Sequence, residues 1–453
     1  MRGVEIIRGR FLNSKINMAE QKLTNADKAY MVAKTFFNEN NIISFNKTFY
    51  YYKDGIFRME STDNTLAWIN KVYISKYGPT NSGQILEVGK MIQNLTYEEH
   101  RKAIKQLDES KGNKINIKSG IMDLDTLKVK PYTKSDFCFH KLPFDYIKDP
   151  SCPEFAKFLT SSMNFEWEEQ ADPTDYQEVM YFIQEWMGYS LIPGNPFHKA
   201  LILYGSGRNG KGVLMNIWSH ILGEHNVSSV DIKGINDGDT VFMTKNKLVN
   251  FSGDIQTGQQ LDTGVIKSAV AGEKVVVNEK YKPQYDMNFT AKLIIACNDL
   301  PYIRSVGAAI KERFYLLPFL RVFAEHERDP YLKDKLKTEA AHIFSWAVNG
   351  LKRLMERGHF VPPQRSLLSS SDYLKSHDSV AMWIDEDNIK KEGVRAKRAE
   401  VWKHYKDYCK EGNLYIMQKF RFFKKLEELK FRPTRINGTY FIEDMELPNQ
   451  TLL

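Results

Sequence analysis

The sequence has few cysteines and no long hydrophobic run. Its four cysteines among 453 residues are scattered and lack the spacing of metal ligands, which predicts a reduced protein without structural zinc. No apolar stretch approaches the roughly 20 residues that a membrane-spanning helix requires. Residues 1–15 are basic but lack the apolar segment of a secretory signal. These absences predict a cytoplasmic protein with no membrane partner.

Acidic charge is scarce near the C-terminus. The formal net charge is +8, and residues 388–435 contain 15 Lys and Arg against 6 Asp and Glu, so the rest of the chain is close to neutral. A basic module on a neutral body favours a polyanionic partner such as DNA. A solvated face of a helix explains the same charges equally well.

The remaining composition is typical of a folded protein with several domains. Hydrophobic residues make up 42% and charged residues 26%, and the length is sufficient for two to four domains. Between residues 197 and 319, apolar strand-like segments alternate with helical patterns, which predicts a parallel sheet covered by helices and thus an α/β fold. The expected strands are residues 200–204, 247–252, 293–296 and 314–318.

The flanking regions have different patterns. Residues 26–129 mix helical segments with strands, including a hairpin signal at Lys53-Asp54-Gly55. Residues 176–189 form an amphipathic helical pattern that Gly188 is expected to end, and a long pattern over 330–357 is closed by Gly358. Near the C-terminus, two helices precede a hairpin around Asn437-Gly438, an order typical of a winged-helix module. Its aromatic residues are expected mainly in the core: Trp402, Tyr405, Phe420 and Phe422.

A glycine-rich loop between a strand and a helix is the most informative motif. It follows the apolar residues 201–204 and reads Gly205, Ser206, Gly207, Arg208, Asn209, Gly210, Lys211, Gly212, Val213. Glycines allow backbone N–H groups to surround a phosphate, and the lysine neutralises the β- and γ-phosphates. The helix N-terminus adds partial positive charge. The motif therefore predicts a nucleotide-binding site formed by these nine residues.

Three polar residues follow or precede the later strands in the order that an ATPase requires. Asp254 follows one strand and would hold Mg²⁺ or orient water, and Asn298 follows the next and would sense the γ-phosphate. Arg313 precedes the last strand and would stabilise charge on the transferring phosphoryl group. Individually they could be a turn residue, a helix cap and a surface charge, but together they favour an ATPase with Lys211, Asp254, Asn298 and Arg313 as catalytic residues.

Residues 265–282 resemble the motif peculiar to superfamily 3 helicases, the ring-forming AAA+ helicases of small DNA viruses, phages and plasmids. The resemblance implies that a lysine-bearing hairpin grips DNA phosphates in a central channel. The matching positions here are Lys280 and Lys282, with Tyr281 between them and Lys267 upstream as further DNA-binding residues. A solvated hairpin tip is the alternative.

The flanks are similar to the poxvirus, phage and plasmid primase–helicase family, through residues 115–126, 149–155, 185–189 and 343–351. That resemblance covers about residues 27–431. It implies an AAA+ P-loop ATPase core preceded by an α+β N-terminal domain and followed by helical and winged-helix-like modules. The expected divisions are a leader or linker remnant (1–25), the N-terminal domain (26–165), a helical connector (166–196), the core (197–325), a helical subdomain (326–385) and the basic module (386–453).

The family resemblance implies ATP and Mg²⁺ as cofactors, single-stranded or forked DNA as partner, and a hexameric ring in the host cytoplasm with Arg313 acting on a neighbouring subunit. A primase domain often precedes such helicases, and this chain has no acid cluster for one. The sequence departs from the family at two positions. Gly212 replaces the usual Ser or Thr after the lysine, and Gly253 replaces the first acid of the usual pair, which appears here as Gly253-Asp254. Two alternatives therefore remain, a nucleotide-binding scaffold or initiator with weak ATPase activity and a small-molecule kinase.

Overall fold

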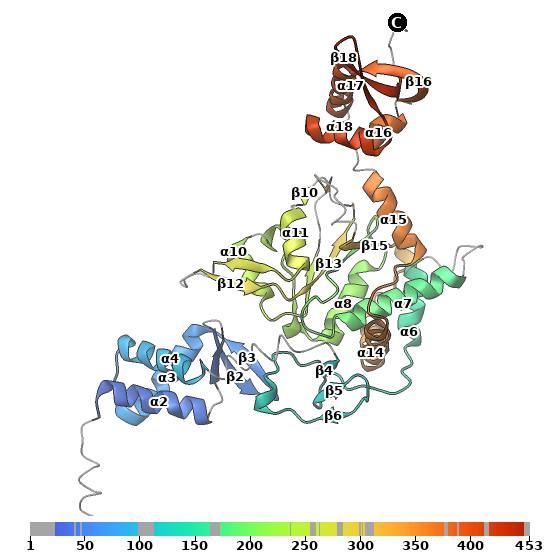
Figure 1. Ribbon diagram of the computed structural model, residues 1–453. Helices are drawn as coiled ribbons and strands as arrows, with labels where there is room; N and C mark the ends of the chain where they lie inside the picture. The colour runs from blue at the N-terminus through green and yellow to red at the C-terminus, as the bar shows by residue number, and fades with distance from the viewer. Residues whose placement is uncertain are drawn as a thin grey trace, which may run out of the picture. The chain divides into compact units, whose positions relative to one another are not determined.

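The computed structural model describes residues 23–39, 42–45, 48–97, 113–163, 173–235, 237–253, 260–261, 263–278, 284–298, 300, 302–303, 312–375, 379–386, 389–411 and 416–447. The chain divides into two compact units, residues 1–141 and 142–453 (Figure 1). None of the described helices is both long enough and apolar enough to cross a membrane. None of the four cysteines, which all lie in the described ranges, forms a disulfide bond.

The N-terminal unit combines a helical layer with small antiparallel sheets. Its first part contains α2 (Asn25–Glu39), β1 (Ile42–Phe45), β2 (Thr48–Lys53), β3 (Ile56–Glu60), α3 (Thr62–Tyr77) and α4 (Ser82–Leu95). β1, β2 and β3 form one sheet, and the expected hairpin turn occurs at Asp54 and Gly55, whose φ angles are 55° and 93°. A second sheet contains β4 (Lys114–Asn116), β5 (Ile121–Asp123) and β6 (Val129–Lys130). The predicted α+β character is confirmed.

Alternation of side chains along the strands gives the first sheet two buried faces. On one face, Phe49 and Ile42 pack against α2, α3 and α4, in a core that includes Phe36. On the other face, Tyr50 packs with Phe57, Phe137 and Phe139. The sheet is therefore enclosed between the helices and the segment that follows β6.

The central sheet of the second unit is parallel and has the order β15–β7–β13–β9–β8. Its strands are β7 (Ala200–Tyr204), β8 (Val227–Ser228), β9 (Val249–Ser252), β13 (Lys292–Cys297) and β15 (Phe314–Pro318). The four expected strands are all present. The sequence missed β8, which has only two residues and therefore no pattern to detect. The late strand β13 lies between β7 and β9, which places residues far apart in the chain at one edge.

Helices and short strands surround this sheet. They are α6 (Pro153–Ser162), α7 (Pro173–Tyr189), α8 (Lys211–Leu222), α9 (Ile232–Ile235), α10 (Gly238–Val241), α11 (Thr263–Val270), α13 (Leu332–Thr338), α14 (Ala340–Arg357) and α15 (Gln364–Lys375). The short strands β10 (Gln260–Leu261) and β14 (Tyr302–Ile303) pair with each other. The strands β11 (Lys274–Val277) and β12 (Tyr285–Asn288) form an antiparallel pair, as the expected hairpin requires.

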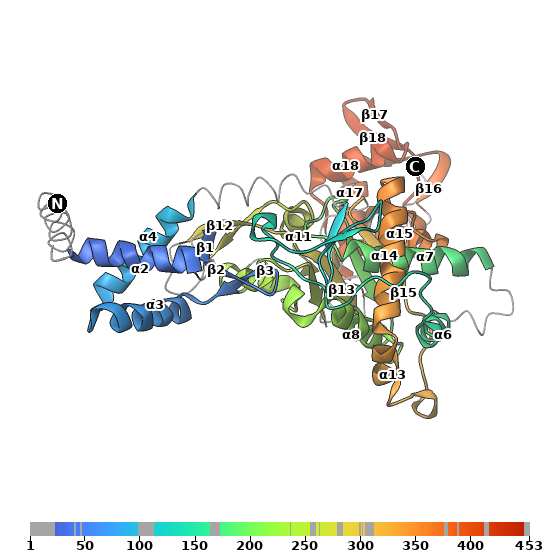
Figure 2. The same cartoon turned by 90° about the horizontal axis from the view of Figure 1, so that it is seen from below.

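Two glycines allow α7 and α14 to cross closely, as Figure 2 shows. A Cβ at Gly188 would overlap the carbonyl oxygen of Ala347, and one at Gly350 would overlap that of Gln184. The helix expected at 176–189 ends at Tyr189 as predicted and begins at Pro173, and Gly188 in its last turn serves packing. The expected long helix at 330–357 is divided at Glu339 into α13 and α14, and Gly358 closes it as predicted, with φ 79°.

The C-terminal part contains α16 (Ser379–Glu386), β16 (Lys390–Lys397), α17 (Arg398–Glu411), α18 (Lys419–Glu428), β17 (Pro433–Ile436) and β18 (Thr439–Met445). The predicted hairpin β17–β18 is present, and β16, which the sequence missed, pairs with β18. Tyr405 and Phe422 are fully buried, and Trp402 packs against the same core, as expected. Phe420 was also expected in the core, but it is 81% exposed, because it lies on the outer face of α18.

Candidate nucleotide-binding site

The glycine-rich loop connects the end of β7 to the start of α8. Gly207 and Gly210 have φ angles of 90° and 92°, and Arg208 has φ 54°. A left-handed backbone conformation is readily available only to glycine. Gly210 is also the N-cap residue of α8 and has no side chain to occupy the first-turn N–H groups. The loop therefore has the backbone geometry of an anion-binding turn at a helix N-terminus.

The ammonium group of Lys211 lies inside this loop. It donates to the carbonyl oxygen of Gly205 at 2.7 Å, to Asn209 Oδ1 at 3.1 Å and to Asn298 Oδ1 at 3.4 Å. The side chain is buried although it carries a charge, and the three oxygen atoms provide the compensating acceptors. Two of the predicted catalytic residues, Lys211 and Asn298, are therefore brought together by the fold.

Strand order explains why Asn298 reaches the loop. β13 pairs in parallel with β7, with Cys297 opposite Tyr204, so both strands end at the same edge of the sheet. The chain passes through β8 and β9 before it returns to β13, between β7 and β9. Ligands of open α/β sheets bind at the carboxyl ends of the strands, at such a switch point.

The segment after β15 supports the loop from the other side. The carbonyl oxygen of Phe319 accepts from Asn209 Nδ2 at 3.3 Å, and the N–H of Phe323 donates to the carbonyl of Arg208 at 2.9 Å. No sequence motif predicted a role for this segment. The sequence indicated it only indirectly. The apolar strand β15 pairs in parallel with β7, so the segment that follows β15 begins beside the loop.

Helix α6 contacts the loop at Gly210. A Cβ at Gly210 would overlap Ser162 Oγ and touch Phe158, so only glycine fits here. Ser162 Oγ is buried and has no hydrogen-bond partner among the described residues. The neighbouring Ser161 Oγ accepts a hydrogen bond from Arg321. The loop is thus held by β7, by α6 and by the segment after β15.

The structure describes part of the region that is expected to bind Mg²⁺. Ser252 ends β9, is fully buried, and its Oγ has no partner within the described parts of the chain. Asp254 lies outside those parts. A Cβ at Gly212 would meet no heavy atom within 4 Å, so the backbone there leaves space for a hydroxyl residue. Ser252 therefore places a hydroxyl without a partner among the described residues at the carboxyl end of β9, and a side chain at position 212 would have space.

Two known sequence families match separate parts of the chain. Residues 29–163 match the family described as "D5 N terminal like", and residues 203–311 match the "Family of unknown function (DUF5906)". The second match contains the loop, Lys211, Asn298 and the segment that resembles superfamily 3 helicases.

Three relatives are viral proteins named as helicases. "Putative helicase 121R" of Invertebrate iridescent virus 3 is 21% identical over 227 residues, which is 48% of this chain and 24% of the relative. "Putative helicase 022R" of Frog virus 3 (isolate Goorha) is 21% identical over 221 residues, 44% of this chain and 23% of the relative. "Putative helicase L207/L206" of Acanthamoeba polyphaga mimivirus is 26% identical over 133 residues, 28% and 14% respectively.

Over part of its length, this chain is similar to these putative viral helicases. The matched region spans about a quarter, or less, of the length of these relatives. Similar solved structures include an A-form apo structure of the NrS-1 C-terminal region, 13% identical, with a TM-score of 0.48 and coverage of 91% of this chain and 99% of that one. Another apo structure of that region is 12% identical, with a TM-score of 0.49 and coverage of 92% and 99%.

Arg313 lies at the opposite edge of the sheet from the loop. It precedes β15, whose first residue, Phe314, is paired with Ala200 at the start of β7. Five residues of strand separate that edge from the loop, which corresponds to roughly 16 Å. Arg313 Nη1 donates to the carbonyl oxygen of Lys267 at 2.6 Å. The fold therefore brings Arg313 and Lys267 together, at the end of the sheet opposite to the loop of the same chain.

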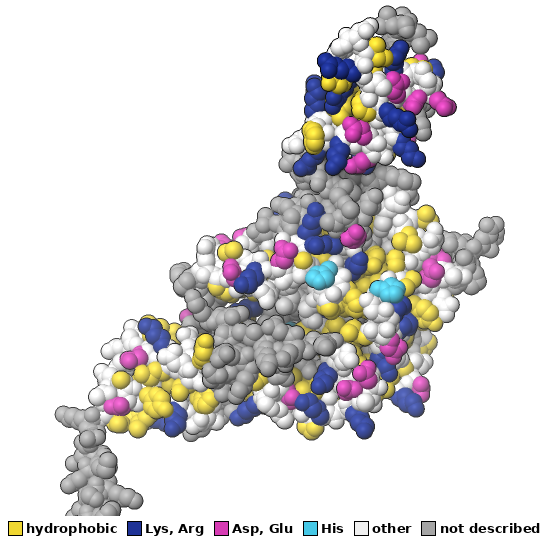
Figure 3. All heavy atoms as spheres, in the orientation of Figure 1, with side chains coloured by type: hydrophobic (Ala, Val, Ile, Leu, Met, Phe, Trp, Pro, Cys, Tyr) yellow, Lys and Arg dark blue, Asp and Glu magenta, His cyan; other side chains and the backbone are white. Residues whose placement is uncertain are grey.

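Other predicted DNA-binding residues follow β11. Lys280, Tyr281 and Lys282 lie outside the described residues, between the paired strands β11 and β12. Basic residues also gather on the C-terminal module, as Figure 3 shows. On α18, the exposed residues Lys419, Arg421 and Lys424 surround the exposed Phe420.

Proposed function

We propose that this chain is an ATP-driven DNA helicase that acts in the replication of a virus, phage, plasmid or related mobile element. The observation that carries the proposal is the contact of Lys211 with Gly205, Asn209 and Asn298 inside a left-handed glycine loop. The names of the viral relatives support a helicase rather than another ATPase.

The residues of the loop would bind the phosphates of ATP. Backbone N–H groups at residues 205–213 would surround them, and Lys211 would exchange its oxygen acceptors for phosphate oxygens of equal or greater charge. Asn298, which now contacts Lys211, would follow the γ-phosphate. Mg²⁺, when bound, would neutralise charge on the phosphates. Its candidate protein ligands are Ser252, the last residue of β9, and Asp254, which follows two residues later in the sequence.

Arg313 would act on the ATP of a neighbouring subunit. Its position at the edge of the sheet away from its own loop supports action in trans, and hence a ring, which we propose is a hexamer. Arginine fingers of this kind contribute about a thousandfold or more to hydrolysis. DNA would pass along Lys280, Tyr281, Lys282 and Lys267, with the basic surface of α18 as a second contact.

The first test is ATP hydrolysis by the wild type and by Lys211→Ala, with and without single-stranded DNA. We expect hydrolysis that DNA stimulates in the wild type and no measurable hydrolysis in the variant. Hydrolysis that DNA does not change would contradict a DNA motor, and a small-molecule kinase would bind no single-stranded DNA.

Action in trans is tested by mixing Lys211→Ala with Arg313→Ala. Each variant alone should be inactive, because every ATP site between two subunits then lacks either Lys211 or Arg313. In a mixed ring, some contacts join an intact Lys211 to an intact Arg313, so part of the activity should return. Absence of recovery from variants that still oligomerise would refute the arginine finger.

The second candidate function is a nucleotide-binding scaffold or replication initiator with weak hydrolysis. It is favoured by Gly212, which supplies no hydroxyl to Mg²⁺. Because a Cβ at this position meets no atom within 4 Å, Gly212→Ser should fold normally. If the missing hydroxyl limits catalysis, this substitution should raise the rate of hydrolysis several-fold at low Mg²⁺ concentration. If DNA already stimulates hydrolysis by the wild type and Gly212→Ser leaves the rate unchanged, the scaffold function is rejected.

A further inference from the structure

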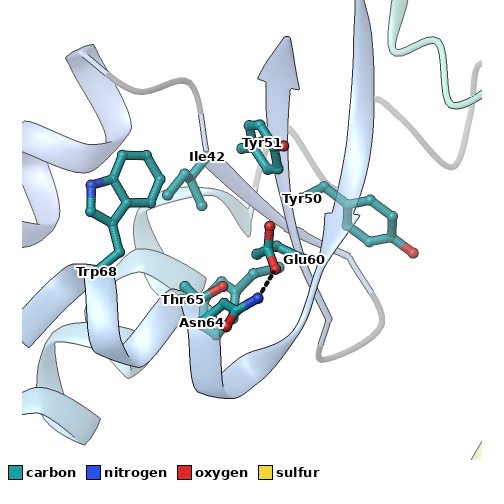
Figure 4. Close-up of a pocket in the computed structure, with 8 residues that line it drawn as sticks. Ile42, Tyr50, Tyr51, Glu60, Asn64, Thr65 and Trp68 are labelled. Atoms are coloured by element: carbon teal, nitrogen blue, oxygen red, sulfur yellow. Dashed lines mark hydrogen bonds between the residues drawn. The ribbon is translucent and has the colours of Figure 1, made fainter.

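A pocket of about 240 Å³ opens on the N-terminal unit between the first sheet and helix α3 (Figure 4). Rings and an aliphatic side chain form its walls, and a carboxylate, an amide and a hydroxyl are grouped on one side. Its lining residues are Ile42, Phe49, Tyr50, Tyr51, Glu60, Asn64, Thr65 and Trp68. Apolar walls with a few convergent polar groups are typical of sites for small ligands or single planar groups.

Strand register sets the side chains of this pocket beside one another. Phe49 pairs with Glu60 and Tyr51 pairs with Arg58, so these four residues share one face of β2 and β3. Helix α3 contributes Trp68 to the pocket lining. Its ring packs edge-on against Phe36 with a centroid distance of 4.9 Å, yet 36% of the residue is exposed. An indole, a phenol ring and a carboxylate therefore line the pocket, and Arg58 lies on the same sheet face opposite Tyr51.

The carboxylate of Glu60 is held in position. Its Oε1 atom accepts from the backbone N–H of Ser61 at 3.0 Å and from Asn64 Nδ2 at 2.8 Å. Both donors use the same oxygen. Figure 4 shows the other oxygen pointing away from Asn64, towards the side where Ile42 and Tyr51 lie. The pocket thus offers a preorganised acceptor between aromatic walls.

An acceptor between rings suits a planar group with N–H donors along one edge. Guanine has this character, with neighbouring N–H groups at N1 and N2, and the guanidinium of an arginine-containing peptide has it too. Charge separates these two ligands. Residues 1–141 contain 23 Lys and Arg against 15 Asp and Glu, a net charge of +8. A unit of this charge attracts a polyanion and repels a basic peptide.

We propose that this pocket binds one unpaired guanine base of single-stranded DNA. Trp68 and Tyr51 contact the faces of the base, and Glu60 accepts hydrogen bonds from its donor edge. Arg58, whose side chain is 44% exposed and 3.6 Å from Asp54, is placed beside Tyr51 to contact a flanking phosphate. The choice of single-stranded DNA rests on the proposed function. The base preference rests on the pocket itself.

The test uses the full chain and three fluorescein-labelled oligonucleotides that differ at one position. One is oligo-dT, one carries a central dG and one a central dA. Dissociation constants are measured by fluorescence anisotropy at one fixed salt concentration, because non-specific contacts depend strongly on salt. We expect the dG oligonucleotide to bind on the order of tenfold more tightly than the other two.

Two variants and one matched control locate this preference. Glu60→Gln keeps an acceptor for Ser61 and Asn64 but places a donor in the pocket, so the preference for dG should disappear while binding of oligo-dT persists. Trp68→Ala should weaken binding of the dG oligonucleotide on the order of tenfold. Tyr30→Ala removes an aromatic residue that is 46% exposed on α2 and does not line the pocket, and it should change nothing.

Equal affinity of the wild type for all three oligonucleotides would overturn the proposal, as would a dG preference that survives in both variants. An arginine-rich peptide that binds the wild type, loses affinity in Glu60→Gln and is not displaced by the dG oligonucleotide would also overturn it. Hydrolysis assays on the same samples keep the two proposals apart. DNA-stimulated hydrolysis without base preference removes the pocket assignment alone.

Discussion

The two edges of the central sheet each hold a buried lysine, and the two lysines differ in their surroundings. Lys211 lies at the carboxyl edge, after β7, and donates to the carbonyl oxygen of Gly205. Lys292 is the first residue of β13, at the amino edge, and donates to the carbonyl oxygen of Ile192. Burial and a bond to a carbonyl oxygen are common to both.

The two lysines differ in the groups that surround their side-chain nitrogen atoms. Lys211 is surrounded by Asn209, Asn298 and the N-terminus of α8, which together can receive a polyanion. Lys292 is fully buried over the ring of Tyr189, with 4.6 Å from Nζ to the ring centroid, and desolvation holds its pKa well below the usual value. A buried lysine therefore indicates a binding site only where the backbone around it can also bind the ligand.

The largest difference should appear in ATP hydrolysis. Lys211→Ala should lower the rate by about a hundredfold or more, since it removes the charge that faces the phosphates. Lys292→Met should retain hydrolysis at permissive temperature, because its side chain lies at the opposite edge of the sheet. Comparable losses in two folded variants would remove the distinction between the edges.

A smaller effect is expected from two neighbouring glycines at the carboxyl edge. Gly210→Ala should destabilise the protein by about 2 kcal/mol and weaken nucleotide binding, because φ is 92° and the new Cβ overlaps Ser162 Oγ. Gly212→Ala is the matched control. It adds a methyl group to the first turn of α8 where no atom lies within 4 Å, and should gain about 0.5–1 kcal/mol. Urea unfolding of both variants measures the difference, and equal stabilities would show that the loop does not require glycine at 210.

The last prediction concerns pH and the amino edge of the sheet. In the folded state the pKa of Lys292 is lowered, so between that value and 10.5 the unfolded chain binds more protons than the folded one. Stability must therefore rise with pH in that window, by roughly 1 kcal/mol per pH unit. The free energy of unfolding of the wild type, relative to Lys292→Met, should increase from pH 7 towards pH 10. A flat difference would show that Lys292 remains charged when buried.

Much of the fold was predictable because local patterns reported it. The four long strands of the central sheet, the turn at Asp54-Gly55 and the helix end at Gly358 each have a signal within a few residues. Errors arose where tertiary contacts override local preference. The sequence predicted the end of α7 but not the packing role of Gly188, where α14 lies too close for any side chain. Phe420 was assigned to the core on its residue type, and the register of α18 points it outwards.

The sequence by itself determined the glycine loop, because nine consecutive residues contain its glycines and lysine, and left-handed backbone is a local property. The pairing of Lys211 with Asn298, 87 residues apart, was decided by the position of β13 between β7 and β9. Tertiary structure also decided the separation of Arg313 from that loop, and the meeting of Trp68 with Tyr51 and Glu60. Such contacts depend on strand order and register, which are set by the packing of the whole core rather than by any short stretch of the chain.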